Sequence, residues 1–304
     1  MNLYLASVFS NGSMRKILKE TRGGFLDVYL AGGISGNCKP MWSQLVADCI
    51  KKGGGASMDL YLAANWEGIG KAYIPKENMF DLSILESFFY ADGWIESLIP
   101  YLKNFMLDSG AFTFMSSHKG KVDWNDYLKR YADFINKNDV KLFYELDIDS
   151  IVGYDAVLQM RKFLETETGK KPIPVWHKSR GKEEFLKMCE EYDYVAIGGI
   201  VSKEITSQEY KYFPWFINEA HKRGAKIHGL GFTNLEGIRK YHFDSVDSTS
   251  WTTGNRFGSI YRFNGTTMEK YDKKAGQRLA DSRAVAINNF NEWIKFQKYA
   301  ETNL

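Results

Sequence analysis

From about residue 105, short apolar runs alternate with amphipathic stretches of helical length. The runs are rich in β-branched and aromatic residues, end in a small or acidic residue, and predict strands at 104–108, 140–147, 173–177, 194–199, 226–230 and 243–247. The stretches between them predict helices at Trp124–Lys137, Asp155–Glu167, Lys182–Glu191, Phe213–Arg223 and Leu235–Tyr241. Strand–helix units in unbroken succession indicate a parallel sheet.

The remaining strands of a closed barrel are expected from earlier apolar runs at Leu3–Val8, Leu26–Ala31, Leu60–Ala63 and Leu82–Tyr90. The predicted fold is therefore α/β, a (β/α)8 TIM barrel, formed as a single domain over residues 1–304 and best defined over 104–251. After residue 251 the sequence predicts a basic C-terminal segment and a docking helix, which together span 252–304.

Composition says more about the cellular location of the protein than about the reaction it performs. Of the 304 residues, 40 are Lys or Arg and 37 are Asp or Glu, and the net charge of +3 is only weak evidence for an anionic partner. Cys38, Cys49 and Cys189 are scattered without CxxC spacing, which supports neither a disulfide framework nor a thiolate metal site. Without a signal-like start or a long apolar run, we expect a cytoplasmic protein that does not contact membranes.

Two aspartates stand where predicted strands end. Asp108 follows the run Phe105-Met106-Leu107, and Asp247 ends the run that begins at Phe243. In a barrel of this class, chemistry is done at the carboxyl ends of the strands, so two such carboxylates suggest a nucleophile and a proton-transfer partner that face one substrate. Each could instead cap the following helix. Asp244 lies three residues before Asp247, and only one of the two can face the barrel mouth squarely.

The segment from Glu145 to Asp149 places acids at alternate positions, which predicts three carboxylates on one strand face. Such a cluster is costly unless a metal, a base or cationic partners bind it. A metal-dependent barrel hydrolase that uses Asp147, Asp149, His177 and Asp247 is therefore an alternative. His177 could equally be a structural histidine at the end of its strand.

Two other predicted strands end in glycine. Gly198-Gly199-Ile200 would leave backbone amides open to a flat ligand or a phosphate, although a tight turn explains the pair as well. The segment His228-Gly229-Leu230-Gly231 repeats the pattern on the next strand.

With these strand ends in order, residues 104–251 resemble the tRNA-guanine transglycosylase superfamily, most closely the phage-type relatives that place 7-deazaguanines in DNA. Asp108-Ser109-Gly110-Ala111-Phe112 is similar to the family's DSGGF or DSGGY segment, and Leu146-Asp147-Ile148 to the segment with the base-recognising Asp. Gly198-Gly199-Ile200 is similar to the GGL turn, His228-Gly229-Leu230-Gly231 to MGVG, and Asp244-Ser245-Val246-Asp247-Ser248 to DxFD(C/S).

The resemblance implies a (β/α)8 enzyme, a pentosyltransferase, that exchanges guanine in nucleic acid for a 7-deazaguanine such as 7-cyano-7-deazaguanine, without a cofactor. It implies that Asp247 is the nucleophile and Asp108 the general acid/base. Asp147 would recognise the base, and Phe112 and His228 would sandwich its ring. Ser109, Gly198, Gly199, Ile200 and Gly229 complete the expected substrate-binding set.

The sequence also departs from the family pattern. Ala111 replaces a Gly, and Thr113 stands where many members have a Gln that contacts the base. No cysteine follows Asp247, so the zinc-binding subdomain of the tRNA enzymes is not expected. DNA is therefore the expected polymer, with tRNA as an alternative, and a catalytically silent nucleic-acid binding module as another.

The target base must be flipped out or come from a single strand. Candidates for contacts with nucleic-acid phosphates are Lys178, Arg180, Arg256, Lys273 and Lys274, each of which could simply be a solvated surface charge.

Overall fold

Eight parallel strands form a ring in the computed structural model, which describes residues 57–110, 113, 122–274, 276 and 281–304, without the side chains of 255 and 256. The strands are β1 (Asp59–Ala64), β2 (Ser83–Ser87), β3 (Asn104–Asp108), β4 (Leu142–Phe143), β5 (Val175–Trp176), β6 (Tyr194–Ile197), β7 (Lys226–Gly229) and β8 (Ser245–Ser248). Their order is β4-β3-β2-β1-β8-β7-β6-β5. A parallel bridge between Tyr144 and Ile173 joins the two outer strands, so the sheet closes as a (β/α)8 barrel.

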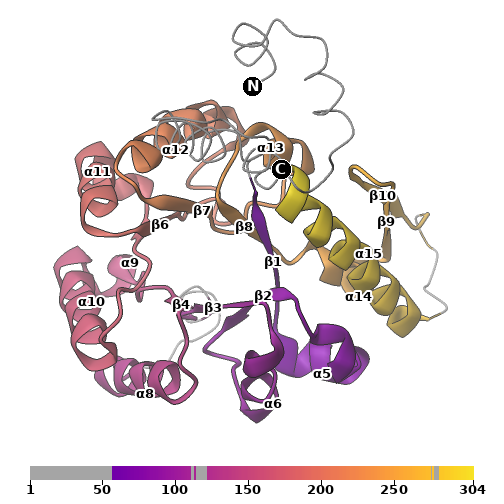
Figure 1. Ribbon diagram of the computed structural model, residues 1–304, viewed down its shortest axis with the longest axis horizontal. Helices are drawn as coiled ribbons and strands as arrows, with labels where there is room; N and C mark the ends of the chain where they lie inside the picture. The colour runs from indigo at the N-terminus through magenta and orange to yellow at the C-terminus, as the bar shows by residue number, and fades with distance from the viewer. Residues whose placement is uncertain (1–56, 111–112, 114–121, 275, 277–280) are drawn as a thin grey trace, which may run out of the picture. The chain divides into compact units, whose positions relative to one another are not determined.

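Helices lie outside this ring of strands (Figure 1). The longer ones are α8 (Trp124–Lys137), α10 (Tyr154–Thr168), α11 (Gly181–Glu191), α12 (Phe213–Lys222), α13 (Leu235–Lys240) and α15 (Ser282–Asn303). The shorter ones near the site are α9 (Asp149–Val152), η4 (Lys178–Arg180), η5 (Ser207–Tyr212) and α14 (Thr253–Phe257). No described helix is both long enough and apolar enough to cross a membrane.

All eight barrel strands lie between Asp59 and Ser248, so the ring is complete without the runs at Leu3–Val8 and Leu26–Ala31, which fall outside the described residues. The strand predicted at 140–147 is wrong in its second half, because β4 ends at Phe143. Beyond Tyr144, the Ile148 amide donates to the Leu146 carbonyl, and this tight turn ends the alternation of side chains.

Apolar side chains fill the lumen of the barrel from successive strands. A distinct buried cluster consists of Tyr61, Ala63, Leu85, Met106, Tyr144, Ile173, Val175 and Ala196. Because side chains in a strand alternate, a residue two positions beyond a lumen residue points the same way, one layer nearer the mouth. Asp108 stands in this relation to Met106, and His177 to Val175. The strand register therefore aims these polar side chains at the carboxyl end of the barrel.

The last helix completes the outer layer beside β1. The Gln297 side chain on α15 donates to the carbonyls of Leu60 and Ser83, each at 2.6 Å, which ties the helix to β1 and β2. A hairpin of β9 (Ser259–Phe263) and β10 (Met268–Asp272) also packs on α15 (Figure 1). The helix ends at Asn303, inside the segment 252–304 where a docking helix was expected.

Candidate active site at the carboxyl ends of the strands

A pocket of about 1130 Å³ opens at the carboxyl ends of the strands. Three carboxylates line it, from Asp108 at the end of β3, Asp147 after β4 and Asp247 on β8. Other lining residues come from every part of the rim and include Asn65, Ser87, His177, Gly199, Ile200, Leu230, Gly231 and Thr249. The pocket therefore brings together acids from distant parts of the sequence, with Asp108 and Asp247 more than one hundred positions apart.

Asp108 has the most perturbed carboxyl group in the pocket. Burial raises its pKa from 3.8 to about 7, and the carboxylates of Asp147 and Asp247 add to the effect. The Gly110 amide donates to Asp108 Oδ2 at 3.0 Å and partly offsets this rise. At neutral pH the group can therefore both donate and accept a proton, as a general acid/base must.

Asp247 is held by hydrogen bonds to one carboxylate oxygen. Oδ1 accepts from the Gly231 amide and lies 3.2 Å from His228 Nε2. The other nitrogen of His228 contacts the Ser245 hydroxyl, which in turn contacts the Tyr194 hydroxyl. If Tyr194 donates to Ser245 and Ser245 to His228 Nδ1, the imidazole proton is on Nε2, facing Asp247. Oδ2 forms no hydrogen bond among the described residues, and Asp247 lines the pocket.

His228 is not where stacking on a base would require it. Its side chain is fully buried, lies outside the pocket lining and makes edge contacts with the rings of Tyr61 and Tyr144 in the lumen. The expected ring-covering role is therefore wrong for this residue, because its position on β7 points into the barrel below the mouth. Leu230, two positions further along, lines the pocket instead.

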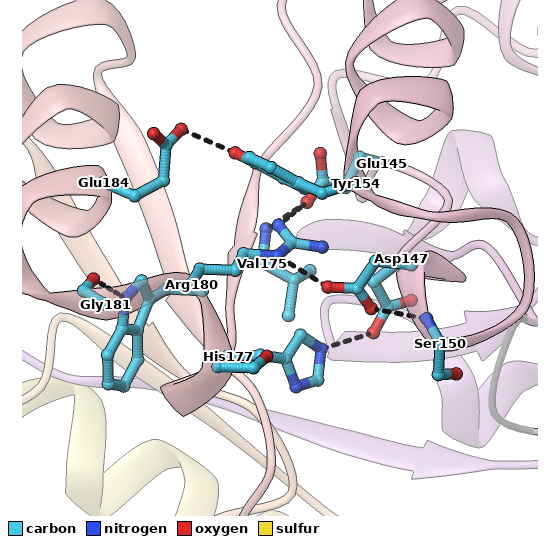
Figure 2. A network of polar contacts seen from close by, with 12 residues as sticks. Glu145, Asp147, Ser150, Tyr154, Val175, His177, Arg180, Gly181 and Glu184 are labelled. Carbon is cyan, nitrogen blue, oxygen red and sulfur yellow. Dashed lines mark hydrogen bonds and ion pairs between the residues drawn. The ribbon is translucent and has the colours of Figure 1, made fainter.

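Glu145, Asp147 and Asp149 do not form one cluster, because each has different partners; Figure 2 shows Glu145 and Asp147 with theirs. Glu145 is fully buried, where its Oε2 accepts from Arg161 Nε at 2.6 Å and its Oε1 from Arg180 Nη1 at 2.7 Å. Asp149 accepts from Arg180 Nε at 3.0 Å. Asp147 alone reaches the pocket, where His177 Nε2 lies 3.3 Å from its Oδ2.

This arrangement neutralises the acids with cationic side chains. In the described part of the chain, no group of three or more His, Cys, Asp or Glu side chains is arranged to hold a metal ion. The residues that the metal-hydrolase alternative would use do not form one site. Asp149 is paired with Arg180, and His177 lies between the carboxylates of Asp147 and Glu204.

Of the other expected binding residues, Gly199 and Ile200 line the pocket, whereas Gly198, Gly229 and the fully buried Ser109 lie outside the lining. The expected open amide is wrong for Gly198, because this amide donates to the Trp176 carbonyl. Phe112 is outside the described residues. Asp244 precedes β8 and accepts from the Ile227 amide, so Asp247 is the residue of this segment that reaches the pocket.

The candidates for phosphate contacts differ in their exposure and in their ion pairs. Arg180 is wrong as a surface contact, because only 1% of its side chain is exposed and it is paired with Glu145 and Asp149. Lys178 is exposed but forms an ion pair with Glu209. Lys273 and Lys274 are exposed after β10, and the side chain of Arg256 is outside the described part.

Sequence reasoning missed the contributions of β1 and β2, and of Glu204 in the loop after β6. Asn65 and Ser87 follow or end strands whose register could not be fixed from the sequence. Glu204 accepts from His177 in a loop without periodicity, and no motif marks it. Only the rule that strand ends meet at the barrel mouth could have pointed to Asn65 and Ser87.

Comparisons with known proteins leave the family open. No family model matches the chain. It is 26% identical over 181 residues to "Uncharacterized protein 306" of Sulfolobus islandicus rod-shaped virus 1, and the match covers 55% of this chain and 56% of the viral protein. The chain thus spans about half the length of this curated relative.

Two solved structures are distant neighbours. A putative fructose-1,6-bisphosphate aldolase from Coccidioides immitis gives a TM-score of 0.45 at 13% identity, covering 85% of this chain and 91% of that one. The carboxyl transferase domain of Rhizobium etli pyruvate carboxylase gives 0.40 at 12% identity, covering 89% of this chain and 53% of that one.

Proposed function

We propose that the protein is a base-exchange transglycosylase, which replaces guanine in nucleic acid with a 7-deazaguanine such as 7-cyano-7-deazaguanine. The observation that carries the proposal is a single pocket lined by Asp108, Asp147 and Asp247 at the mouth of the barrel. Retaining displacement at a sugar carbon needs two carboxyl groups with different tasks and a covalent intermediate. Asp108 has a pKa raised to about 7, which suits a proton-transfer group, whereas Asp247 has one oxygen held by Gly231 and His228, which suits an oriented nucleophile.

In the first half of the reaction, Asp247 Oδ2 attacks C1′ of the nucleotide and the bond from C1′ to N9 of guanine breaks. Gly231 and His228 hold the opposite oxygen, so the attacking oxygen is oriented before the substrate arrives. Asp108 gives its proton to the departing base. Its pKa of about 7 supports this step, because the protonated form is well populated at neutral pH.

In the second half, the 7-deazaguanine occupies the place of guanine and Asp108, now ionised, removes the proton from its N9. The N9 nitrogen attacks C1′, and the bond between C1′ and Asp247 breaks to regenerate the carboxylate. Asp147 faces the same pocket and can accept hydrogen bonds from the amidine-like edge of either base. The two bases therefore use the same contacts in turn.

The size of the pocket supports a nucleotide rather than a free base as the larger ligand. Its volume of about 1130 Å³ exceeds the usual small-molecule range of roughly 300–1,000 Å³. A flipped nucleotide brings a sugar and a phosphate with the base. We propose DNA rather than tRNA as the polymer, because the sequence lacks cysteines after Asp247 that could build the zinc site of tRNA enzymes.

The test is exchange of labelled guanine into polynucleotide. Purified protein is incubated with radiolabelled guanine and, in parallel, duplex DNA, single-stranded DNA or tRNA. The proposal predicts incorporation into DNA that is lost in Asp247→Asn and is chased out by unlabelled 7-cyano-7-deazaguanine. Incorporation into tRNA alone would assign the alternative polymer, and incorporation by Asp247→Asn equal to the wild type would refute the mechanism.

A further inference from the structure

His177 bridges two carboxylates that lie far apart in the sequence. Its Nε2 lies 3.3 Å from Asp147 Oδ2, and its Nδ1 lies 3.1 Å from Glu204 Oε2. Asp147 follows β4, whereas Glu204 belongs to the loop between β6 and η5. Figure 2 shows the imidazole of His177 pointing to Asp147.

Geometry assigns a protonation state to this imidazole. A neutral imidazole carries one N–H and would turn a lone pair toward one of the carboxylates, whereas the imidazolium donates to both. The charged groups that act on the ring are Asp147, Glu204 and Arg180, and the two acids outweigh burial and the guanidinium, so the pKa of His177 is raised above 6.5. The side chains therefore form a carboxylate–imidazolium–carboxylate row.

The double glycine after β6 makes room for this row. A Cβ atom at Gly198 would lie 2.8 Å from both His177 Cε1 and Val175 Cγ1, and 3.0 Å from His177 Nε2. At Gly199, where φ is +79°, a Cβ atom would lie 2.8 Å from Glu204 Oε2. A Cβ atom at Gly198 would therefore force the His177 ring to shift, and at Gly199 the positive φ and the nearby Glu204 Cβ, at 3.1 Å, both disfavour a side chain. The side chains at both positions are thus restricted by His177 and Glu204.

We propose that the Gly198-Gly199 turn seats an imidazolium–carboxylate pair, His177 and Glu204, which orients Asp147 and keeps it ionised as the acceptor for the base. The part that concerns the base rests on the proposed function. His177 holds Asp147 Oδ2, whereas Oδ1 forms no hydrogen bond among the described residues and Asp147 lines the pocket, so we assign Oδ1 as the acceptor for the base. His177 and Glu204 are positioning residues in this scheme.

The pair matters because Asp147 lies in a difficult place for a charge. Burial raises its pKa and Glu145 adds to the rise, while His177 and Arg180 lower it. Asp108, also in the pocket, is a further acid that repels it. Without the imidazolium, more of Asp147 would be protonated at neutral pH, and a protonated carboxyl offers a donor where the amidine-like edge of guanine also donates.

The first test observes the imidazole directly and needs no ligand. Long-range ¹H–¹⁵N spectra of the full chain are recorded against pH, and the His177 signals are assigned by their loss in His177→Gln. We expect both ring nitrogens to stay protonated to a pH above 6.5, and Glu204→Gln to lower the midpoint. A midpoint at or below 6.5, or one that Glu204→Gln leaves unchanged, would overturn the inference.

The second test measures binding of 7-cyano-7-deazaguanine by calorimetry over a pH series. In His177→Gln the loss of affinity on acidification should begin at a higher pH, with about a tenfold weaker Kd for each unit by which the pKa of Asp147 rises above the pH. Affinity should also fall at alkaline pH, where His177 loses its proton, and Glu204→Gln should move this alkaline fall in affinity to lower pH. The matched control is His221→Gln, whose imidazole pairs with Asp244 outside the pocket and should leave both falls in affinity in place.

The outcomes separate the inference from the function on which it rests. If the imidazole titrates as expected but the wild type does not bind the base, the pair stands and the transglycosylase proposal fails. If the wild type binds and His177→Gln keeps the wild-type pH profile, the positioning role fails. Should His177→Gln not fold, Gly198→Ala crowds the His177 ring together with Val175 Cγ1, and Gly93→Ala is the control because a Cβ atom there meets nothing within 4 Å.

Discussion

The buried carboxyl group of Asp108 should weaken the fold at alkaline pH, and Asp108→Asn should relieve this cost. The folded-state pKa is about 7 and the ordinary value is 3.8. Below both values the group is protonated in both states and contributes nothing. Between them, only the unfolded chain releases the proton, so stability falls as pH rises, and the full cost is present above about pH 7.

The magnitude follows from the size of the pKa shift. A rise from 3.8 to about 7 corresponds to roughly 4 kcal/mol at about 1.4 kcal/mol per unit. Part of this is mutual repulsion with Asp147 and Asp247, so roughly 4 kcal/mol is the upper bound for Asp108→Asn. The amide oxygen of Asn can still accept from Gly110, which makes the substitution close to isosteric.

The assay is urea unfolding of the wild type and Asp108→Asn at about pH 4 and about pH 8. The free energy of unfolding of the variant should exceed that of the wild type by little at about pH 4 and by most of the upper bound at about pH 8. The control is Asp126→Asn on α8, which breaks an exposed pair with Arg130 and should cost a few tenths of a kcal/mol at both pH values. A gain for Asp108→Asn that does not grow with pH would refute the reasoning, and so would a loss at alkaline pH.

Two other predictions concern charges around the barrel. Glu145→Ala should lower the free energy of unfolding by about 3–5 kcal/mol, because it leaves Arg161 and Arg180 buried without their shared partner; urea unfolding that shows a cost below about 1 kcal/mol would contradict this. Lys273→Glu combined with Lys274→Glu should weaken binding to duplex DNA and flatten its salt dependence by about one unit of slope per lost phosphate contact. Fluorescence anisotropy across a salt series measures both, and an unchanged slope would remove these lysines from the interface.

The regular parts of the fold could be predicted from periodicity. The helix expected at 124–137 has those bounds in the structure, because Asp123 caps its start and its apolar face is continuous. The strand at 104–108 is likewise as expected. The early strands β1 and β2 were harder, since their apolar runs lie among irregular segments that carry no helical period.

The site could be predicted as far as strand ends determine it. Asp108, Asp147 and Asp247 meet in one pocket because the carboxyl ends of parallel strands meet at the barrel mouth. The side-chain direction at His228 could not be predicted, since it depends on where β7 enters the ring. The ion pairs of Arg180 were equally inaccessible, because they join segments more than 30 residues apart.

The most direct test of the central claim is capture of the covalent intermediate. Wild-type protein and variants are mixed with a short guanine-containing DNA, quenched with acid, and examined by intact mass spectrometry and peptide mapping. The account predicts a DNA adduct mapped to Asp247 in the wild type, none in Asp247→Asn, and an adduct in Asp244→Asn, whose carboxyl lies outside the pocket. An adduct on any other residue, or an undiminished one in Asp247→Asn, would contradict it.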